Sequence, residues 1–165
     1  MLKKFEEKAI QQNRATQLCK QIRFIRRDDE EKLENKRKRV LVVDDDKSIG
    51  DLTQLMLRSA GYECTVLHSG RECLEKLKSA AGIGAYDLIL LDVAMPGFSG
   101  IDVISALNKQ GTARQYKIVF FTASITGSLE EPELRKLGAL DCIRKPFSKA
   151  GLLEKVDQAI KETGR

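Results

Sequence analysis

The sequence predicts an α/β fold in which a doubly wound, five-stranded parallel sheet is covered by helices on both faces. From residue 40 onward, short and almost continuously apolar runs alternate five times with longer segments whose apolar residues recur at helical spacing. Strands that are apolar throughout are typical of parallel sheets buried on both faces, and right-handed crossovers favour the doubly wound arrangement. An N-terminal stretch without this alternation precedes the first run and predicts an α-helical extension.

The composition fits one soluble globular domain and excludes several other classes of protein. The chain has 165 residues, of which 42% are apolar, so it can bury a real core. Its longest apolar runs are too short to span a membrane, and its first residues are too charged for a signal peptide. Four cysteines without a CxxC spacing and a single histidine argue against a disulfide framework or a zinc site. We therefore expect a cytoplasmic protein with reduced thiols and no membrane association.

The five expected strands are short apolar runs. Apart from polar residues at their ends, the first, third and fourth consist of Val, Ile, Leu and Phe, which is typical of buried parallel strands. The second has a weaker signal and the fifth is shorter. The expected strands span Val40–Asp45, Cys64–His68, Asp87–Asp92, Lys117–Thr122 and Leu140–Arg144.

A segment with helical periodicity follows each strand, and local signals mark where some of these helices begin or end. Gly61 is a stop signal for the first helix, Pro132 fits the first turn of the fourth, and Ser148 fits the N-cap of the last. The apolar face of the first helix is expected to hold Ile49, Leu52, Met56 and Ala60. The expected helices span Lys47–Ala60, Gly70–Ala81, Gly100–Asn108, Leu129–Leu137 and Ser148–Glu162.

Residues 1–39 differ from the rest and are expected to form a charged helical extension or linker. They hold 13 Lys and Arg against 7 Asp and Glu, a net charge of +6, whereas the remainder of the chain carries −1. They contain no Gly or Pro and are rich in good helix formers. Two interpretations stay open: an arm that dimerises or binds a partner, and a solvated linker ending in the basic cluster Lys36–Arg39. Few aromatics accompany the basic residues, so nucleic-acid binding is not indicated.

Polar side chains lie at the ends of four of the expected strands, at the edge where doubly wound sheets bind their ligands. These side chains belong to Asp44-Asp45-Asp46, Asp92, Thr122 and Lys145. Several carboxylates that meet at one edge stay ionised together only if a cation lies among them, and all-oxygen ligands favour Mg²⁺. A lysine and a hydroxyl beside that ion suit a phosphoryl group. A carboxylate can also be the nucleophile that receives it.

Each of these residues also has a purely structural interpretation. Aspartates after a strand are often helix N-caps, Lys-Pro is often only a turn, and threonine is common in strands. Their occurrence together, each at the end of a successive strand, favours the chemical interpretation.

Four segments resemble the motifs of two-component response regulator receiver domains, the CheY-like family. They are Val40–Asp45 (VLVVDD), Leu90–Gly97 (LLDVAMPG), Phe121–Ser124 (FTAS) and Lys145–Phe147 (KPF). Their order, spacing and flanking residues agree with the family, and the resemblance covers about residues 40–163. It implies a flavodoxin-like receiver domain that takes a phosphoryl group from the phosphohistidine of a histidine kinase or phosphotransfer protein.

The resemblance also implies a role for each site residue. Asp92 is the expected phosphoacceptor, Thr122 would bond the phosphoryl group, and Lys145 would form an ion pair with it. Asp46 is expected to be a helix cap, and Lys145–Pro146 a cis peptide. The expected Mg²⁺ ligands are the carboxylates of Asp44, Asp45 and Asp92 and the backbone carbonyl of Ala94, with Asp45 bound directly and Asp44 through water.

One residue departs from the family pattern. The family often has Tyr or Phe three residues before the lysine, and here that position is Cys142. A thiol cannot report the switch as an aromatic ring does, which puts the usual signalling face in doubt. Since this sequence stops after the closing helix, we expect the output to be a protein contact, a phosphorelay step or an action of residues 1–39. Homodimerisation through the N-terminal helix is one form that this action could take.

Two other functions remain as alternatives. The segment Asp44–Ser48 also resembles the opening motif of haloacid-dehalogenase-type phosphatases, in which Asp44 would be the nucleophile. However, the remaining acidic motif of those enzymes follows the lysine, whereas Asp92 precedes Lys145. A receiver-like binding module without chemistry is the second alternative, and the complete set of site residues argues against it. We therefore expect a phosphoacceptor signalling domain rather than an enzyme.

Overall fold

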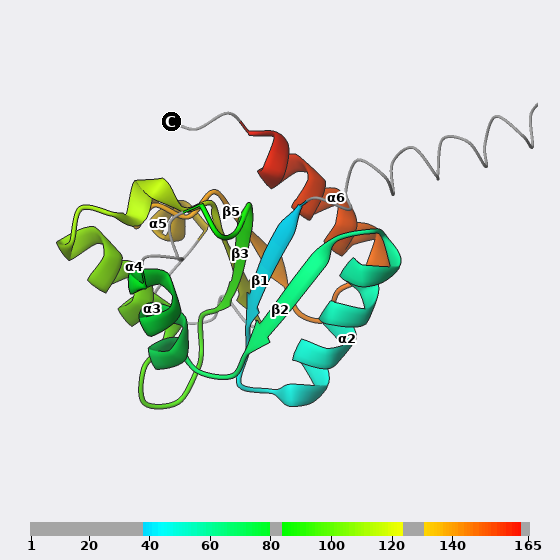
Figure 1. The fold of residues 1–165 in the computed structure, drawn as a ribbon, viewed down its shortest axis with the longest axis horizontal. Helices are drawn as coiled ribbons and strands as arrows, with labels where there is room; N and C mark the ends of the chain where they lie inside the picture. The colour runs from blue at the N-terminus through cyan, green and yellow to red at the C-terminus, as the bar shows by residue number, and fades with distance from the viewer. Residues whose placement is uncertain (1–37, 80–83, 124–130, 163–165) are drawn as a thin grey trace, which may run out of the picture.

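The computed structural model describes residues 38–79, 84–123 and 131–162, and the expected extension lies almost entirely outside them (Figure 1). In the described part, five strands form one sheet in the order β2-β1-β3-β4-β5, and every neighbouring pair is parallel. The strands are β1 (Arg39–Val43), β2 (Glu63–Leu67), β3 (Leu88–Asp92), β4 (Ile118–Thr122) and β5 (Asp141–Arg144). The helices are α2 (Lys47–Ser59), α3 (Gly70–Lys78), α4 (Gly100–Lys109), α5 (Glu131–Lys136) and α6 (Lys149–Lys161), with a 3₁₀ turn, η1 (Ala113–Gln115). The predicted α/β, doubly wound fold class is therefore confirmed.

The sheet separates two apolar cores. Side chains of α3 and α4, such as Cys73 and Val103, pack with alternate strand residues on one face. Side chains of α2 and α6, such as Leu57 and Val156, pack on the other face (Figure 1). Strands β3 and β4 are buried at all five positions. Their first four residues point alternately into the two cores, and their last residues, Asp92 and Thr122, are buried polar residues.

The face that the first helix presents to the sheet agrees only in part with the one that its apolar spacing predicts, because Met56 and Ala60 pack against the core but Leu52 does not. The buried residues of α2 are Gly50, Thr53 and Leu57, whereas Leu52 is 48% exposed. The expectation that Leu52 faces the core is therefore wrong. Gly50 accounts for the shift, since a Cβ there would lie 2.9 Å from a Val66 methyl group, and the helix approaches β2 closely at this residue.

The ends of the elements agree with several predicted signals. Asp46 is the N-cap of α2, and its carboxylate accepts hydrogen bonds from the backbone N–H groups of Ser48 and Ile49. Ser148 is the N-cap of α6, and its hydroxyl accepts from the N–H of Gly151. The first strand ends at Val43, two residues before its predicted end, so the two aspartates that follow lie in the loop between β1 and α2.

Candidate functional site

The predicted site residues meet at the carboxyl edge of the sheet. The chain leaves β1 toward β2 on one side and enters β3 on the other, so β1 and β3 flank the point where the strand order reverses. The loop after β1 carries Asp44 and Asp45, the last residue of β3 is Asp92, and the last residue of β4 is Thr122. Lys145 follows β5, and its backbone N–H donates to the carbonyl of Thr122 at 2.7 Å. Parallel pairing therefore unites residues that are up to about a hundred positions apart.

Three carboxylates form a compact cluster there. Carboxylate oxygens of Asp44, Asp45 and Asp92 all lie within 4.8 Å of one another. Asp44 is completely buried and Asp92 is 6% exposed, whereas Asp45 faces solvent. Burial raises the pKa of the Asp44 carboxyl group, and the nearby Lys145 only partly offsets this effect. The cluster thus holds negative charge in a place where water provides little stabilisation.

Lys145 joins two of these carboxylates. Its Nζ lies 2.6 Å from Oδ2 of Asp44 and 2.8 Å from Oδ2 of Asp92. Burial opposes the charge on the lysine, but hydrogen bonds with Asp44 and Asp92 outweigh it, and the net pKa of Lys145 is raised. The amine therefore stays protonated at neutral pH and is the cation that faces both carboxylates.

Backbone contacts hold the carboxylates in place. The N–H of Asp46 donates to Oδ1 of Asp44 at 3.1 Å, and the N–H of Ala94 donates to Oδ1 of Asp92 at 3.2 Å. The first turn of α4 closes on β3 at Gly100, where a Cβ would lie 2.2 Å from the Asp92 carbonyl oxygen. Only a glycine fits this approach, so α4 begins directly against the strand that carries Asp92.

The donor set fits a hard divalent cation. Carboxylate oxygens are the ligands that Mg²⁺ prefers, and Mg²⁺ is commonly held by only a few protein groups together with water. Asp44 and Asp45 supply oxygens from one loop and Asp92 supplies them from a strand end, close enough to share one ion. Burial, more than the neighbouring carboxylate of Asp92, raises the pKa of Asp44, and a cation bound among the three carboxylates would favour its ionised form.

Two features near the site were not predicted as parts of it. The imidazole Nδ1 of His68 lies 3.1 Å from the backbone carbonyl oxygen of Asp44, although the sequence suggests only a residue at the end of a strand. The Phe147 ring stacks on the ring of Phe121, with centroids 5.1 Å apart. Sequence patterns give no signal for either contact, because the partners lie more than twenty residues apart. The predicted cis peptide at Lys145–Pro146 is confirmed.

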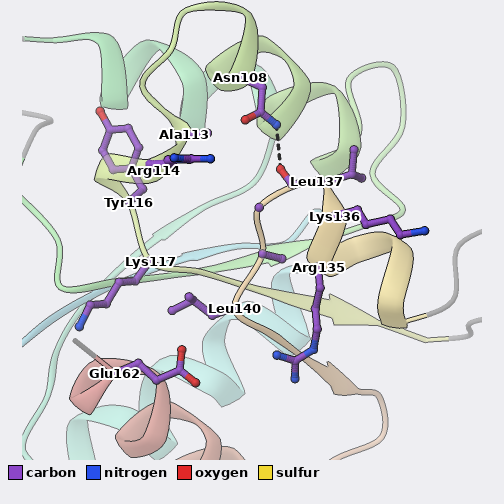
Figure 2. Close-up of a pocket in the computed structure, with 12 residues that line it drawn as sticks. Asn108, Ala113, Arg114, Tyr116, Lys117, Arg135, Lys136, Leu137, Leu140 and Glu162 are labelled. Atoms are coloured by element: carbon purple, nitrogen blue, oxygen red, sulfur yellow. Dashed lines mark hydrogen bonds between the residues drawn. The ribbon is translucent and has the colours of Figure 1, made fainter. Parts of the chain in front are cut away.

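A pocket of about 330 Å³ lies at the opposite edge of the sheet, among the ends of α4, α5 and α6 (Figure 2). The side-chain amide of Asn108 donates to the Leu137 carbonyl across it at 2.7 Å. Of its basic residues, Arg135 and Lys136 lie in the last turn of α5, where cations compensate the helix dipole. Arg135 also forms an ion pair with Asp141 at 3.1 Å. The predicted site residues line no part of this pocket.

The sheet is flavodoxin-like, and an acidic cluster with a lysine lies at its switch point. These features define a class of protein that binds a metal ion and a phosphoryl group at the carboxyl edge of the sheet. Residues 40–157 match the response regulator receiver domain family. The match covers well over half of the chain, which therefore belongs to this family. The predicted resemblance is confirmed, and the chain is a receiver protein of the two-component type.

Relatives and solved structures agree with this assignment. The chain is 36% identical over 127 residues to the uncharacterized transcriptional regulatory protein YkoG of Bacillus subtilis, covering 76% of this chain and 52% of that protein. It is 35% identical over 118 residues to the transcriptional regulatory protein DltR of Streptococcus agalactiae, covering 72% and 50%. The chain thus spans about half the length of these curated relatives.

Among solved structures, the chemotaxis protein CheY4 of Vibrio cholerae has a TM-score of 0.64 at 31% identity, covering 74% of this chain and 98% of that one. The receiver domain of the Francisella response regulator 1452 has a TM-score of 0.65 at 30% identity, covering 75% and 97%. Each of these two similarities covers about three quarters of this chain. In the residues that the structure describes, no helix combines the length and the apolarity needed to cross a membrane.

Proposed function

We propose that this protein accepts a phosphoryl group on Asp92 from a phosphohistidine of a histidine kinase or phosphotransfer protein, in the cytoplasm. Family membership implies a histidine kinase as partner. The observation that carries the assignment to Asp92 is the placement of its carboxylate within reach of both the other two aspartates and the Lys145 amine. A nucleophile needs such a setting, because charge develops on the transferred group.

The proposed reaction is an in-line transfer. A carboxylate oxygen of Asp92 forms a bond to phosphorus while the N–P bond of the donor breaks, and the imidazole leaves with the bond electrons and takes up a proton. Lys145, whose raised pKa keeps it cationic, pairs with the transferred phosphoryl oxygens. The Thr122 hydroxyl and the Ala94 N–H, which lie at the ends of β4 and β3, donate to the same oxygens.

The proposed Mg²⁺ ligands are the carboxylates of Asp44, Asp45 and Asp92 and the carbonyl of Ala94. When bound, the ion neutralises the carboxylates and the incoming phosphoryl charge. Lys145 contacts Asp44 as well as Asp92, so the lysine and the ion would together compensate the charge of these carboxylates. The buried position of Asp44 then becomes favourable, because the ion compensates the charge that burial destabilises.

We further propose that the output is a protein contact or a phosphorelay step, with residues 1–39 as a dimerising or partner-binding arm. The supporting observations are the +6 charge and the absence of Gly and Pro in that segment. Cys142 is buried on β5, where many receivers have an aromatic ring, so the output is proposed not to use a ring movement there. Deleting residues 1–37 should change the oligomeric state in light scattering or abolish a partner contact. Unchanged behaviour in both assays would refute the arm.

The phosphorylation proposal is tested with acetyl phosphate and Mg²⁺, by following the gain of one phosphoryl mass on the intact chain. The wild-type protein should gain one acid-labile phosphoryl group, and Asp92→Asn should gain none. Asp92→Asn separates this proposal from the phosphatase alternative, because it leaves Asp44, the nucleophile of that alternative, in place. Labelling that survives in Asp92→Asn and disappears in Asp44→Asn would refute the assignment to Asp92.

A further inference from the structure

The ring of His68 contacts the backbone of the acidic loop. His68 follows β2, is partly buried, and places Nδ1 3.1 Å from the carbonyl oxygen of Asp44. A carbonyl oxygen can only accept a hydrogen bond, so Nδ1 carries the hydrogen and donates it. This carbonyl belongs to the peptide that joins Asp44 to Asp45.

The contact lies where the β1–β2 ladder ends. Pairing runs as far as Val43 opposite Leu67, and the N–H of Asp44 still donates to the Leu67 carbonyl at 3.1 Å. One further backbone bond in a parallel ladder would come from Ser69, but Ser69 is the N-cap of α3 and its chain turns into the helix. Within the described residues, the hydrogen bond to the Asp44 carbonyl comes from the His68 side chain instead.

The surroundings of the ring favour one orientation. A Cβ at Gly50, in the first turn of α2, would lie 3.6 Å from Cε1 of His68, so the ring packs against this glycine. The backbone N–H of His68 donates to the carboxylate of Glu72 at 3.3 Å, which ties the residue to the first turn of α3. The ring therefore packs against the start of α2 while the backbone of His68 is tied to the start of α3, and one ring nitrogen is directed at the acidic loop.

We propose that His68 is a positioning residue for the Mg²⁺ site, acting through the Asp44–Asp45 peptide. This inference rests on the proposed function. Asp45 is exposed, and the orientation of the Asp44–Asp45 peptide determines the direction of the chain at this residue. A hydrogen bond that fixes the Asp44 carbonyl therefore also fixes where the Asp45 carboxylate lies relative to those of Asp44 and Asp92. Residues that orient metal ligands in this way typically contribute about 10- to 100-fold to metal affinity or activity.

The first test concerns the hydrogen bond alone. His68 is the single histidine of the chain, so its two ring nitrogens can be observed without ambiguity by ¹⁵N NMR. At a pH where the ring is neutral, the hydrogen should reside on Nδ1. A ring that carries its hydrogen on Nε2 would overturn the inference, whatever the protein does with phosphoryl groups.

The second test measures Mg²⁺ affinity by calorimetric titration of the full chain. His68→Ala should bind Mg²⁺ about 10-fold more weakly than wild type. His68→Asn should recover most of that loss, because its amide nitrogen occupies the place of Nδ1 and can donate to the same carbonyl. Glu72→Gln is the matched control, since it alters the other contact of His68 without removing the ring, and should leave the affinity unchanged.

The outcomes separate this inference from the function on which it rests. If wild type binds Mg²⁺ and is phosphorylated while His68→Ala binds equally well, only the positioning role is wrong. The same holds if His68→Asn is as weak as His68→Ala, because the donor would then not be what matters. If wild type itself binds no Mg²⁺, the proposed function fails and this inference fails with it.

Discussion

Replacing Lys145 with methionine (Lys145→Met) leaves the carboxylates of Asp44 and Asp92 without their ion-pair partner. The lysine side chain is 10% exposed, that of Asp44 is fully buried, and that of Asp92 is 8% exposed. Removing one partner of such a buried pair costs about 3–5 kcal/mol, because the remaining charge is left without compensation. We therefore expect the free energy of unfolding of the protein without Mg²⁺ to fall by about 3 kcal/mol at pH 7.

The pH dependence of this loss follows from the directions of two pKa shifts. Burial already raises the pKa of Asp44, and the substitution removes the lysine that partly offsets this effect. The variant loses stability only where the carboxyl group is ionised. The difference in the free energy of unfolding between variant and wild type should therefore shrink as pH falls toward the ordinary aspartate pKa of 3.8. Because the pKa of Lys145 is raised, the stabilisation that the charged lysine gives the folded protein is present at neutral pH. It is lost only as pH rises through that raised pKa.

Urea unfolding measures the difference in the free energy of unfolding between variant and wild type. Far-UV circular dichroism is used to follow it, because the chain has no tryptophan whose fluorescence could report unfolding. A bound ligand at about 100 times its Kd adds about 2.7 kcal/mol to the free energy of unfolding of either protein. Mg²⁺ should in addition narrow the difference between them, because the ion would compensate the carboxylate charge that the missing lysine leaves. Lys149→Met is the matched control, because Lys149 is an exposed lysine at the start of α6. A Lys145→Met variant as stable as wild type at pH 7, or a loss that does not depend on pH, would refute the reasoning.

Three further predictions concern other parts of the fold. Gly100→Ala should lower stability by about 1–3 kcal/mol in urea unfolding, because its Cβ would meet the Asp92 carbonyl oxygen at 2.2 Å. The helical Gly151→Ala, with no contact closer than 3.3 Å, should change stability by less than about 1 kcal/mol. Without Mg²⁺, Asp44→Asn should be more stable than wild type at pH 7 but not below about pH 4, because the substitution removes a carboxylate whose pKa burial raises. A variant that is only as stable as wild type at both pH values would contradict this. Cys73 is completely buried, and burial raises the pKa of its thiol to about 12. A thiol reagent should therefore modify Cys73 only as urea unfolds the chain, and rapid modification of Cys73 in the folded protein would count against its burial.

Much of the site could be predicted because parallel strands share one edge. Asp92, Thr122 and Lys145 are far apart in sequence, yet each follows a strand of the same sheet, so the topology brings them together. The cap at Asp46 was predictable for a local reason, because an aspartate before a helical segment accepts the free N–H groups of the first turn.

The remaining features depend on packing that sequence patterns do not encode. The buried face of α2 includes Gly50 and Thr53, which carry no apolar signal, and the close approach of the helix to β2 determines it. The contact of His68 with Asp44 spans 24 positions and depends on where the ladder between β1 and β2 stops. Leu52, which the periodicity placed in the core, is exposed for the same packing reason.

The central claim is that Asp44, Asp45 and Asp92 together bind one divalent ion beside Lys145. Calorimetric titration with Mg²⁺ tests it most directly, with wild type compared with Asp45→Asn, which changes an exposed loop residue and so leaves the core intact. We predict one ion per wild-type chain and at least about 10-fold weaker binding in the variant, in line with the loss of a ligand or its support. Absence of binding to wild type, or equal affinity in the two proteins, would contradict the account.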